Sequence, residues 1–157
     1  MRALFIFFIF SILSESIYSQ SKLEAKCDQL NGTIVDEILC PQSLKKREGK
    51  FCLLDKMDDG IVFFNGCTGV SSEYGRLFFD DCFKHDLCYH HEPSFSGKSK
   101  QKCDELFKAD MMKTCERAGL GLRCRVIARA FERAVIYGGK KSWSCSDENI
   151  DYTIYLD

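Results

Sequence analysis

One stretch of the chain brings together side chains that could hydrolyse an ester. It reads Asp81-Cys82-Phe83-Lys84-His85-Asp86-Leu87-Cys88-Tyr89, so a histidine stands beside an aspartate between two cysteines. A second acid follows a cysteine at Cys103-Asp104. A base, the carboxylate that orients it and a metal ligand, clamped together in this way, could activate water and polarise a carbonyl group.

Three predicted helices would position these side chains. The first should begin near residue 80 with an aspartate as its cap, and it should end by residue 92 because Pro93 disfavours the α conformation in the residue before it. Helical spacing of apolar residues predicts two further helices, over residues 100–116 and 122–137. The reactive stretch therefore lies on the first helix, and the second acid lies on the next one.

His85 and Asp86 should face different neighbours, because successive helical residues are rotated by about 100°. If a disulfide joins Cys88 to the cysteine before Asp104, that carboxylate could reach His85 and fix its tautomer. Tyr89 is a candidate to hydrogen-bond the same carboxylate. His85 would act as a base on water only when neutral, so activity should fall below about pH 6.5.

A cation site is predicted on the other side of the first helix. If Cys67 bridges Cys82, the loop Asn65-Gly66-Cys67 would be pulled against that helix. Asp86 could then offer its carboxylate to a calcium ion, and backbone carbonyls and the Asn65 amide oxygen would complete the shell. Such an ion would act as a Lewis acid on the substrate carbonyl.

The N-terminus indicates which compartment the protein occupies. Residues 1–19 contain Arg2, an apolar run of about ten residues and then small residues, a pattern typical of a secretory signal peptide cleaved after Ser16 or Ser19. A membrane anchor or a buried helix is the less favoured alternative, because a transmembrane helix needs roughly 20 apolar residues. We therefore expect a secreted, extracellular protein without a transmembrane segment.

The ten cysteines all lie beyond that segment, and their even number in a secreted chain implies a disulfide framework. A bridge from Cys115 to Cys124 would close the turn between the second and third helices. If the three supposed bridges hold, four cysteines remain and can pair in three ways. These four are Cys27, Cys40, Cys52 and Cys145.

The remaining length suits one small domain. We expect it to be all-α, mainly helical and disulfide-rich, with two antiparallel active-site helices joined by a disulfide and a third helix packed on them. Residues 20–62 should form a loop-rich, disulfide-tied segment with room for one hairpin. Residues 63–157 should form the helical core and a C-terminal tail, in one domain with the preceding segment.

A zinc site is the main chemical alternative, and its candidate ligands are Cys82, His85, Cys88, His90 and His91. Secretion and the even cysteine count disfavour zinc. In this interpretation His90 and His91 are solvated residues near the end of the helix.

The formal charge of −1 gives no overall field that would attract nucleic acid. The basic run Lys45-Lys46-Arg47 is interpreted as an exposed loop, although a processing protease could also cut there. The lysines between residues 98 and 102 are unusual, because positive charge at the start of a helix opposes the helix dipole. Asn31-Gly32-Thr33 is a weak signal for N-glycosylation of Asn31 in an exposed loop.

The pattern Cys-x-x-His-Asp-x-Cys-Tyr over residues 82–89 resembles the active-site helix of secreted phospholipases A2. The single cysteine that opens it, the short loop at Asn65 and the Cys103-Asp104 helix are similar to the conodipine, bacterial and fungal branch. The resemblance covers about residues 63–137. It implies a helical, disulfide-bridged fold that hydrolyses the sn-2 ester of phospholipids with calcium, at a membrane or micelle surface.

Carried onto this chain, the resemblance assigns the base to His85 and its partner carboxylate to Asp104. It assigns calcium binding to Asp86, Asn65 and the Gly66 carbonyl group. The alternative is a non-catalytic phospholipase-like toxin or receptor ligand, but a pure binding scaffold has no physical need for the base and both acids. The sequence indicates no particular protein partner.

Overall fold

The structure is a computed structural model that describes residues 22–40, 45–57, 60–67, 73–143, 145 and 151–156. The predicted signal peptide, residues 1–19, lies outside this part of the chain. No described helix is both long and apolar enough to cross a bilayer.

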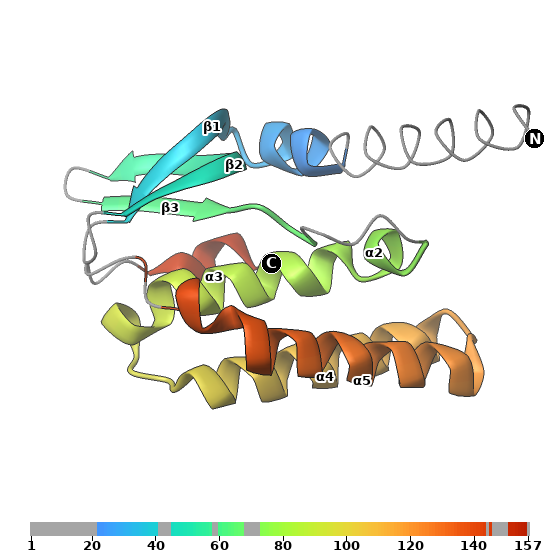
Figure 1. The fold of residues 1–157 in the computed structure, drawn as a ribbon. Helices are drawn as coiled ribbons and strands as arrows, with labels where there is room; N and C mark the ends of the chain where they lie inside the picture. The colour runs from blue at the N-terminus through green and yellow to red at the C-terminus, as the bar shows by residue number, and fades with distance from the viewer. Residues whose placement is uncertain are drawn as a thin grey trace, which may run out of the picture.

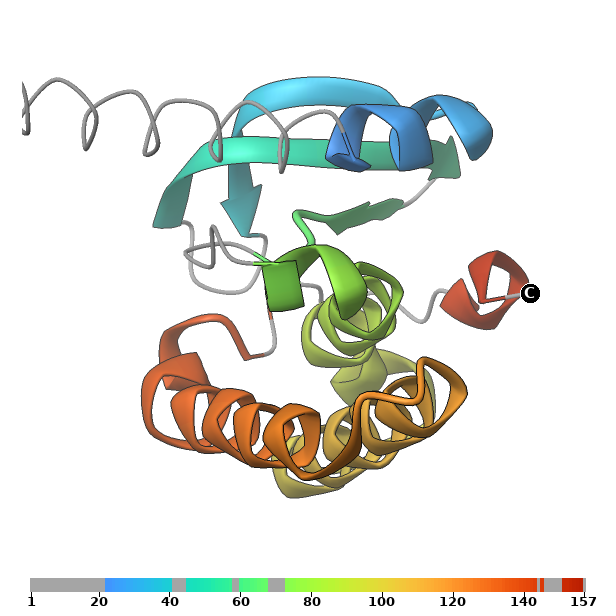
Figure 2. The same ribbon diagram turned by 90° about the vertical axis from the view of Figure 1, so that its right-hand side faces the viewer.

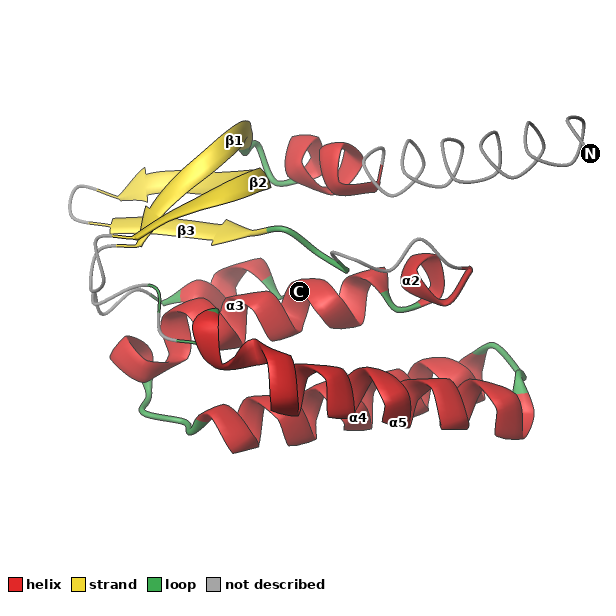
Figure 3. Cartoon of the chain, in the orientation of Figure 1, coloured by secondary structure: helices red, strands yellow, loops and turns green. Residues whose placement is uncertain are grey.

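The elements follow one another as a sheet and then a set of helices (Figures 1 and 3). A helix over residues 22–29 leads into three strands, which are β1 (Thr33–Cys40), β2 (Lys45–Met57) and β3 (Gly60–Phe64). The helices that follow are α2 (Glu73–Leu77), α3 (Phe79–Phe95), α4 (Lys100–Arg117), α5 (Gly121–Gly138) and the 3₁₀ helices η1 (Gly139–Lys141) and η2 (Tyr152–Tyr155).

Helix α3 lies between two layers, with the sheet on one side and the α4–α5 pair on the other (Figure 2). Phe79, Phe83 and Leu87 recur every four residues and join the apolar cluster beneath the sheet. Cys82 joins the second cluster, whose members come mainly from α4 and α5. Because both sides of α3 are covered, buried residues occur all around it, and its functional side chains are held from several directions.

The expectation of a loop-rich N-terminal segment was wrong, because these residues form a three-stranded antiparallel sheet in the order β1-β2-β3. Two alternating pairs explain why the strands form: Cys52 lies opposite Phe64, and Leu54 lies opposite Val62. All four are at most 1% exposed and belong to the cluster shared with α3. Strand β3 also crosses the boundary drawn at residue 62. The sheet also corrects the expectation of an all-α fold, although the protein is mainly helical, as predicted.

Helix α3 extends past Pro93, which was predicted to stop it. The proline stands in the last turn, where its missing N–H removes only one hydrogen bond of the helix. The stop comes instead from Gly97, whose φ of +75° suits glycine and whose N–H donates to the Glu92 carbonyl at 3.1 Å.

The Glu92 side chain anchors the C-terminal part of the chain to α3. Its carboxylate is fully buried and accepts hydrogen bonds from the Tyr152 and Ser96 hydroxyl groups. It also pairs with the Lys98 ammonium at 3.1 Å. The short helix η2 is therefore held against α3 by a buried charge that is itself satisfied by several donors.

All ten cysteines are paired. The bonds are Cys27–Cys52, Cys40–Cys145, Cys67–Cys82, Cys88–Cys103 and Cys115–Cys124. The first two select one of the three arrangements left open by the sequence. They tie the helix over residues 22–29 to β2, and β1 to the segment after η1, so the N-terminal layer is joined covalently to both ends of the domain.

Candidate active site

His85 on α3 and Asp104 on α4 form a buried pair. The His85 Nε2 atom lies 3.1 Å from the Asp104 Oδ1 atom, and the two residues are 7% and 4% exposed. The Cys88–Cys103 disulfide lies beside them, with its α-carbons 5.8 Å apart. Because Cys88 is about one turn beyond His85 and Cys103 precedes Asp104, this bond sets the spacing of the pair.

Two aromatic rings enclose the imidazole. The Tyr89 ring centroid lies 4.1 Å from that of His85, and the Phe107 centroid lies 4.4 Å from it. Burial lowers the pKa of His85 below its usual 6.5, although Asp104 acts in the opposite direction. The ring is therefore a neutral base near pH 7. Since Nε2 faces Asp104, Nδ1 is the nitrogen available to take a proton.

Lys100 was not predicted as part of the site, yet it donates a hydrogen bond to the Asp104 oxygen that does not face His85. Its Nζ atom donates to Asp104 Oδ2 at 2.8 Å, and to the carbonyl groups of Val135 and Ile136 at 3.1 and 3.4 Å. These carbonyls lie in the last turn of α5, where positive charge is favourable. These contacts explain why a positive charge is tolerated at the start of α4. The four-residue spacing between Lys100 and Asp104 could have predicted their contact, because residues four apart are neighbours on a helix.

The Asp104 carboxylate is kept charged by its neighbours. Burial alone would raise its pKa, but hydrogen bonds from His85, Lys100 and Tyr89 outweigh burial and lower it. The Tyr89 hydroxyl also has the Val135 carbonyl within reach, at 3.3 Å. The sequence singled out Tyr89 for contact with this carboxylate.

Asp86 closes the loop that precedes α2. Its Oδ2 atom accepts the backbone N–H groups of Asn65 at 2.9 Å and Gly66 at 2.7 Å. Gly66 has a φ of +70°, a left-handed conformation that favours glycine. The Cys67–Cys82 disulfide fixes the loop to α3.

Asp86 and the loop beside it are the groups that could hold a calcium ion. Burial raises the pKa of Asp86 to about 7 in spite of its two N–H donors, so a nearby cation would stabilise the charged form. Asn65 also carries an amide oxygen and Gly66 a carbonyl oxygen, which are the type of ligand that calcium prefers, while the groups of these two residues that contact Asp86 are their backbone N–H groups. No cluster of three or more histidine, cysteine or acidic ligands occurs within the described ranges. Residues 68–72, which follow this loop in the sequence, lie outside those ranges.

The base and the loop open into one pocket of about 500 Å³, called here the active-site pocket. Its polar wall includes His85, Asp86 and Asn65, and its apolar wall includes Phe107, Phe131 and Val135. Two more polar residues line it that the sequence did not assign to a site: Arg47 from β2 and Ser142 after η1. Arg47 was expected on an exposed loop, but it lies half-buried on a strand.

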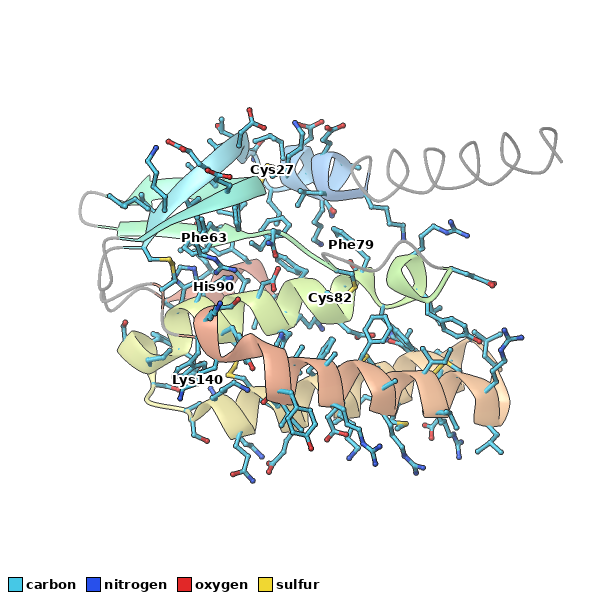
Figure 4. All side chains as sticks on the ribbon, viewed as in Figure 1. Cys27, Phe63, Phe79, Cys82, His90 and Lys140 are labelled. Atoms are coloured by element: carbon cyan, nitrogen blue, oxygen red, sulfur yellow. A yellow bond between two sulfur atoms is a disulfide. The ribbon has the colours of Figure 1, made fainter. Side chains whose placement is uncertain are left out.

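The two histidines after the active-site stretch are buried, contrary to the expectation that they are solvated. His90 and His91 are 1% and 0% exposed. The Phe63 N–H lies 3.2 Å from His91 Nε2, and the Phe63 ring stacks on His90 (Figure 4). Both histidines therefore pack α3 against the sheet. Two of the other candidate zinc ligands, Cys82 and Cys88, form disulfides and so have no thiolate for a metal.

Asn31 lies in an exposed turn after the first described helix, with a φ of 55°. Its side chain is accessible at the surface, and glycosylation there stays a prediction.

Comparison with known families gives a match over the central part of the chain. The family model described as prokaryotic phospholipase A2 matches residues 56–139, which confirms the resemblance to the phospholipase A2 superfamily. The match covers more than half of the chain, and the chain therefore belongs to the prokaryotic phospholipase A2 family. The matched segment contains His85, Asp86 and Asp104 but not Arg47. No curated protein and no solved structure matches the chain significantly.

Proposed function

We propose that this protein is a secreted, calcium-dependent phospholipase A2 that hydrolyses the sn-2 acyl ester of phospholipids at a membrane or micelle surface. The observation that carries the proposal is the 3.1 Å contact between His85 Nε2 and Asp104 Oδ1, on two helices joined by a disulfide. Family membership supports a lipid ester as the substrate. The five disulfides support an extracellular location.

In the proposed reaction His85 is the general base. Its Nδ1 atom takes a proton from a water molecule as that water attacks the ester carbonyl, and the imidazole later returns the proton to the leaving alcohol. Asp104 keeps the proton on Nε2 and stabilises the imidazolium cation. Lys100 keeps Asp104 ionised, and Tyr89 and Phe107 hold the ring in place.

Asp86, the Asn65 side chain and the Gly66 carbonyl are the residues proposed to hold calcium. When bound, the ion would supply Lewis-acid polarisation of the ester carbonyl. The role of this chain is to keep Asp86 beside His85 on α3 and to bring the loop against it through the Cys67–Cys82 bond.

The pocket suits a lipid because one wall is apolar. Phe107, Phe131, Ala134 and Val135 line it, and they come from α4 and α5. An acyl chain could lie against these side chains with its ester near His85, because apolar pockets with a few polar groups bind such ligands.

The second candidate, a non-catalytic toxin or receptor ligand, does not account for the buried base and its partner acid. A binding module would gain nothing from a desolvated histidine and two acids in one pocket, each of which costs stability to bury. The alternative predicts target binding that is unaffected by chelator or by loss of His85.

Fatty acid release from phosphatidylcholine vesicles tests the proposal. Release should occur with calcium, cease with a chelator, and fall roughly 10²- to 10⁴-fold in His85→Gln, which loses the base. Lys84→Gln is the matched control, because it changes an exposed residue next to His85 on the same helix. Equal release with and without chelator would reject the calcium role, and an active His85→Gln variant would reject the base.

A further inference from the structure

Arg47 reaches the active-site pocket from the sheet, outside the segment that matches the family. Its Nη2 atom donates to the Ser142 hydroxyl at 2.9 Å, and its guanidinium carbon lies 5.7 Å from the Phe51 ring centroid. These two contacts hold the planar group in one orientation at the pocket wall. A guanidinium group already held in one orientation loses little conformational freedom when it binds a ligand.

The other terminal nitrogen of Arg47 has no partner. Nη1 is buried, and it makes no hydrogen bond to any described residue. The described part of the chain places no carboxylate within ion-pair distance of this guanidinium, and its acidic neighbour in the pocket, Asp86, acts on it only as a nearby charge. A buried charged donor left unpaired is costly, so it is expected to meet an acceptor when the pocket is filled.

The acceptor should be an oxyanion. Arginine remains protonated and presents a fork of N–H groups that matches phosphate oxygens. The other formally charged side chain lining the pocket is Asp86, which is proposed to serve the cation. Arg47 is thus left as the positive group of the wall, in the same pocket as the base that would attack the ester.

We propose that Arg47 binds the phosphodiester of the phospholipid substrate and so selects phosphate-bearing esters over neutral ones. This inference rests on the proposed function of the same pocket. It assigns a substrate contact to the N-terminal sheet, whose strands β1 and β2 lie almost wholly outside the family match.

The fold holds Arg47 in place through both of its supports. On the sheet, Arg47 lies opposite Ile38 in the β1–β2 register. On the other side, the Ser142 carbonyl lies 3.0 Å from His90 Nδ1. The Cys40–Cys145 bond joins β1 to the segment after Ser142. The phosphate contact therefore has a fixed position relative to α3.

Binding of a phosphate probe without an ester tests this inference independently of catalysis. The probe is an alkylphosphocholine below its micelle concentration, compared by calorimetry with the alcohol of equal chain length and with inorganic phosphate. Wild-type protein should bind the alkylphosphocholine more tightly than either. Arg47→Gln should lose roughly 10- to 100-fold in affinity for it, the range for a charge-assisted hydrogen bond, and Arg47→Lys should lose less.

Lys46→Gln is the matched control, because Lys46 is the neighbouring cation on β2 and pairs with Glu37 at the surface. It should bind the probe like wild type. Unchanged binding by Arg47→Gln, with unfolding temperatures equal to wild type, would overturn the inference. So would a wild-type protein that binds the alcohol as well as the alkylphosphocholine.

Catalysis supplies the second measurement. Arg47→Gln should lower kcat/KM for a short-chain phosphatidylcholine but not for the diacylglycerol with the same acyl chains. Equal losses on both esters would overturn the phosphate contact. If neither ester is hydrolysed by wild type but the probe still binds through Arg47, the proposed hydrolase activity fails and the phosphate site stands.

Discussion

At the scale of single residues, the site depends on a carboxylate that lies between two nitrogen donors. One carboxylate oxygen of Asp104 contacts His85, and the other accepts a hydrogen bond from Lys100. The lysine therefore acts on the imidazole without touching it, because its positive charge is one of the influences that lower the pKa of His85 and keep the ring neutral.

Replacing Lys100 by methionine should move the acid limb of the kcat/KM profile to higher pH. Removal of the ammonium raises the pKa of His85, so the imidazole becomes protonated, and inactive as a base, at a higher pH than in wild type. Rates with short-chain phosphatidylcholine, measured across the acid range, check this. Lys102→Met is the control, because Lys102 is exposed and pairs with Glu105. A limb that stays in place or moves to lower pH contradicts the role of Lys100.

Some residues of the candidate site could be predicted from the sequence and others could not. His85, Asp86 and Asp104 could be predicted because each adjoins a cysteine or another reactive residue within a short motif. Arg47 could not, because its distance to the pocket depends on the packing of the sheet on α3. Its local sequence, three basic residues in a row, resembles a solvated surface.

At the scale of elements, η1, which follows α5 directly, meets the Tyr89 ring that packs on His85. A methyl group at Gly139 would lie 2.5 Å from the Tyr89 hydroxyl oxygen and 2.7 Å from its Cε2 atom. At Gly138, the neighbouring glycine, a methyl would have no described atom within 4 Å. The glycine at 139 thus permits close approach of η1 to α3.

Gly139→Ala should displace Tyr89 and, with it, the ring of His85. Activity should fall by up to about 100-fold, the loss expected when a reacting group is misplaced by an ångström. Gly138→Ala should cost far less. Vesicle hydrolysis and thermal unfolding of both variants check this pair. Similar activity in the two variants would show that Tyr89 does not hold the base.

The helices could be predicted more closely than the sheet. The predicted ranges 100–116 and 122–137 differ from α4 and α5 by no more than one residue at either end, because caps, glycines and apolar spacing are local signals. The strands depend on pairing between distant residues and on burial against α3, which local patterns do not specify. The predicted end of α3 was wrong because the helix tolerates Pro93 in its last turn and stops at Gly97 instead.

At the scale of the whole molecule, the Cys40–Cys145 bond spans the longest stretch of chain. Its two cysteines are 105 residues apart in the sequence, whereas Cys115 and Cys124 are 9 residues apart. In the chain-entropy model a longer loop restricts the unfolded state more, and the difference between these two bonds is about 2 kcal/mol.

Removing the longer bond by the double change Cys40→Ser and Cys145→Ser should therefore lower the free energy of unfolding by about 2 kcal/mol more than the matched change at Cys115 and Cys124. Denaturant unfolding of the two double variants measures the difference. Equal losses, or a greater loss from the shorter loop, would contradict the model for this protein.

The anchoring of Glu92 has a consequence for anyone who wishes to trim the protein to a minimal fragment. A piece bounded by the family match, residues 56–139, would strip Tyr152 from a carboxylate that has no exposed surface. It would also leave β3 without its neighbour along most of its length, and bare strand edges recruit other chains. Recombinant work should keep the flanking segments, because the matched portion alone would lose these contacts with the rest of the chain.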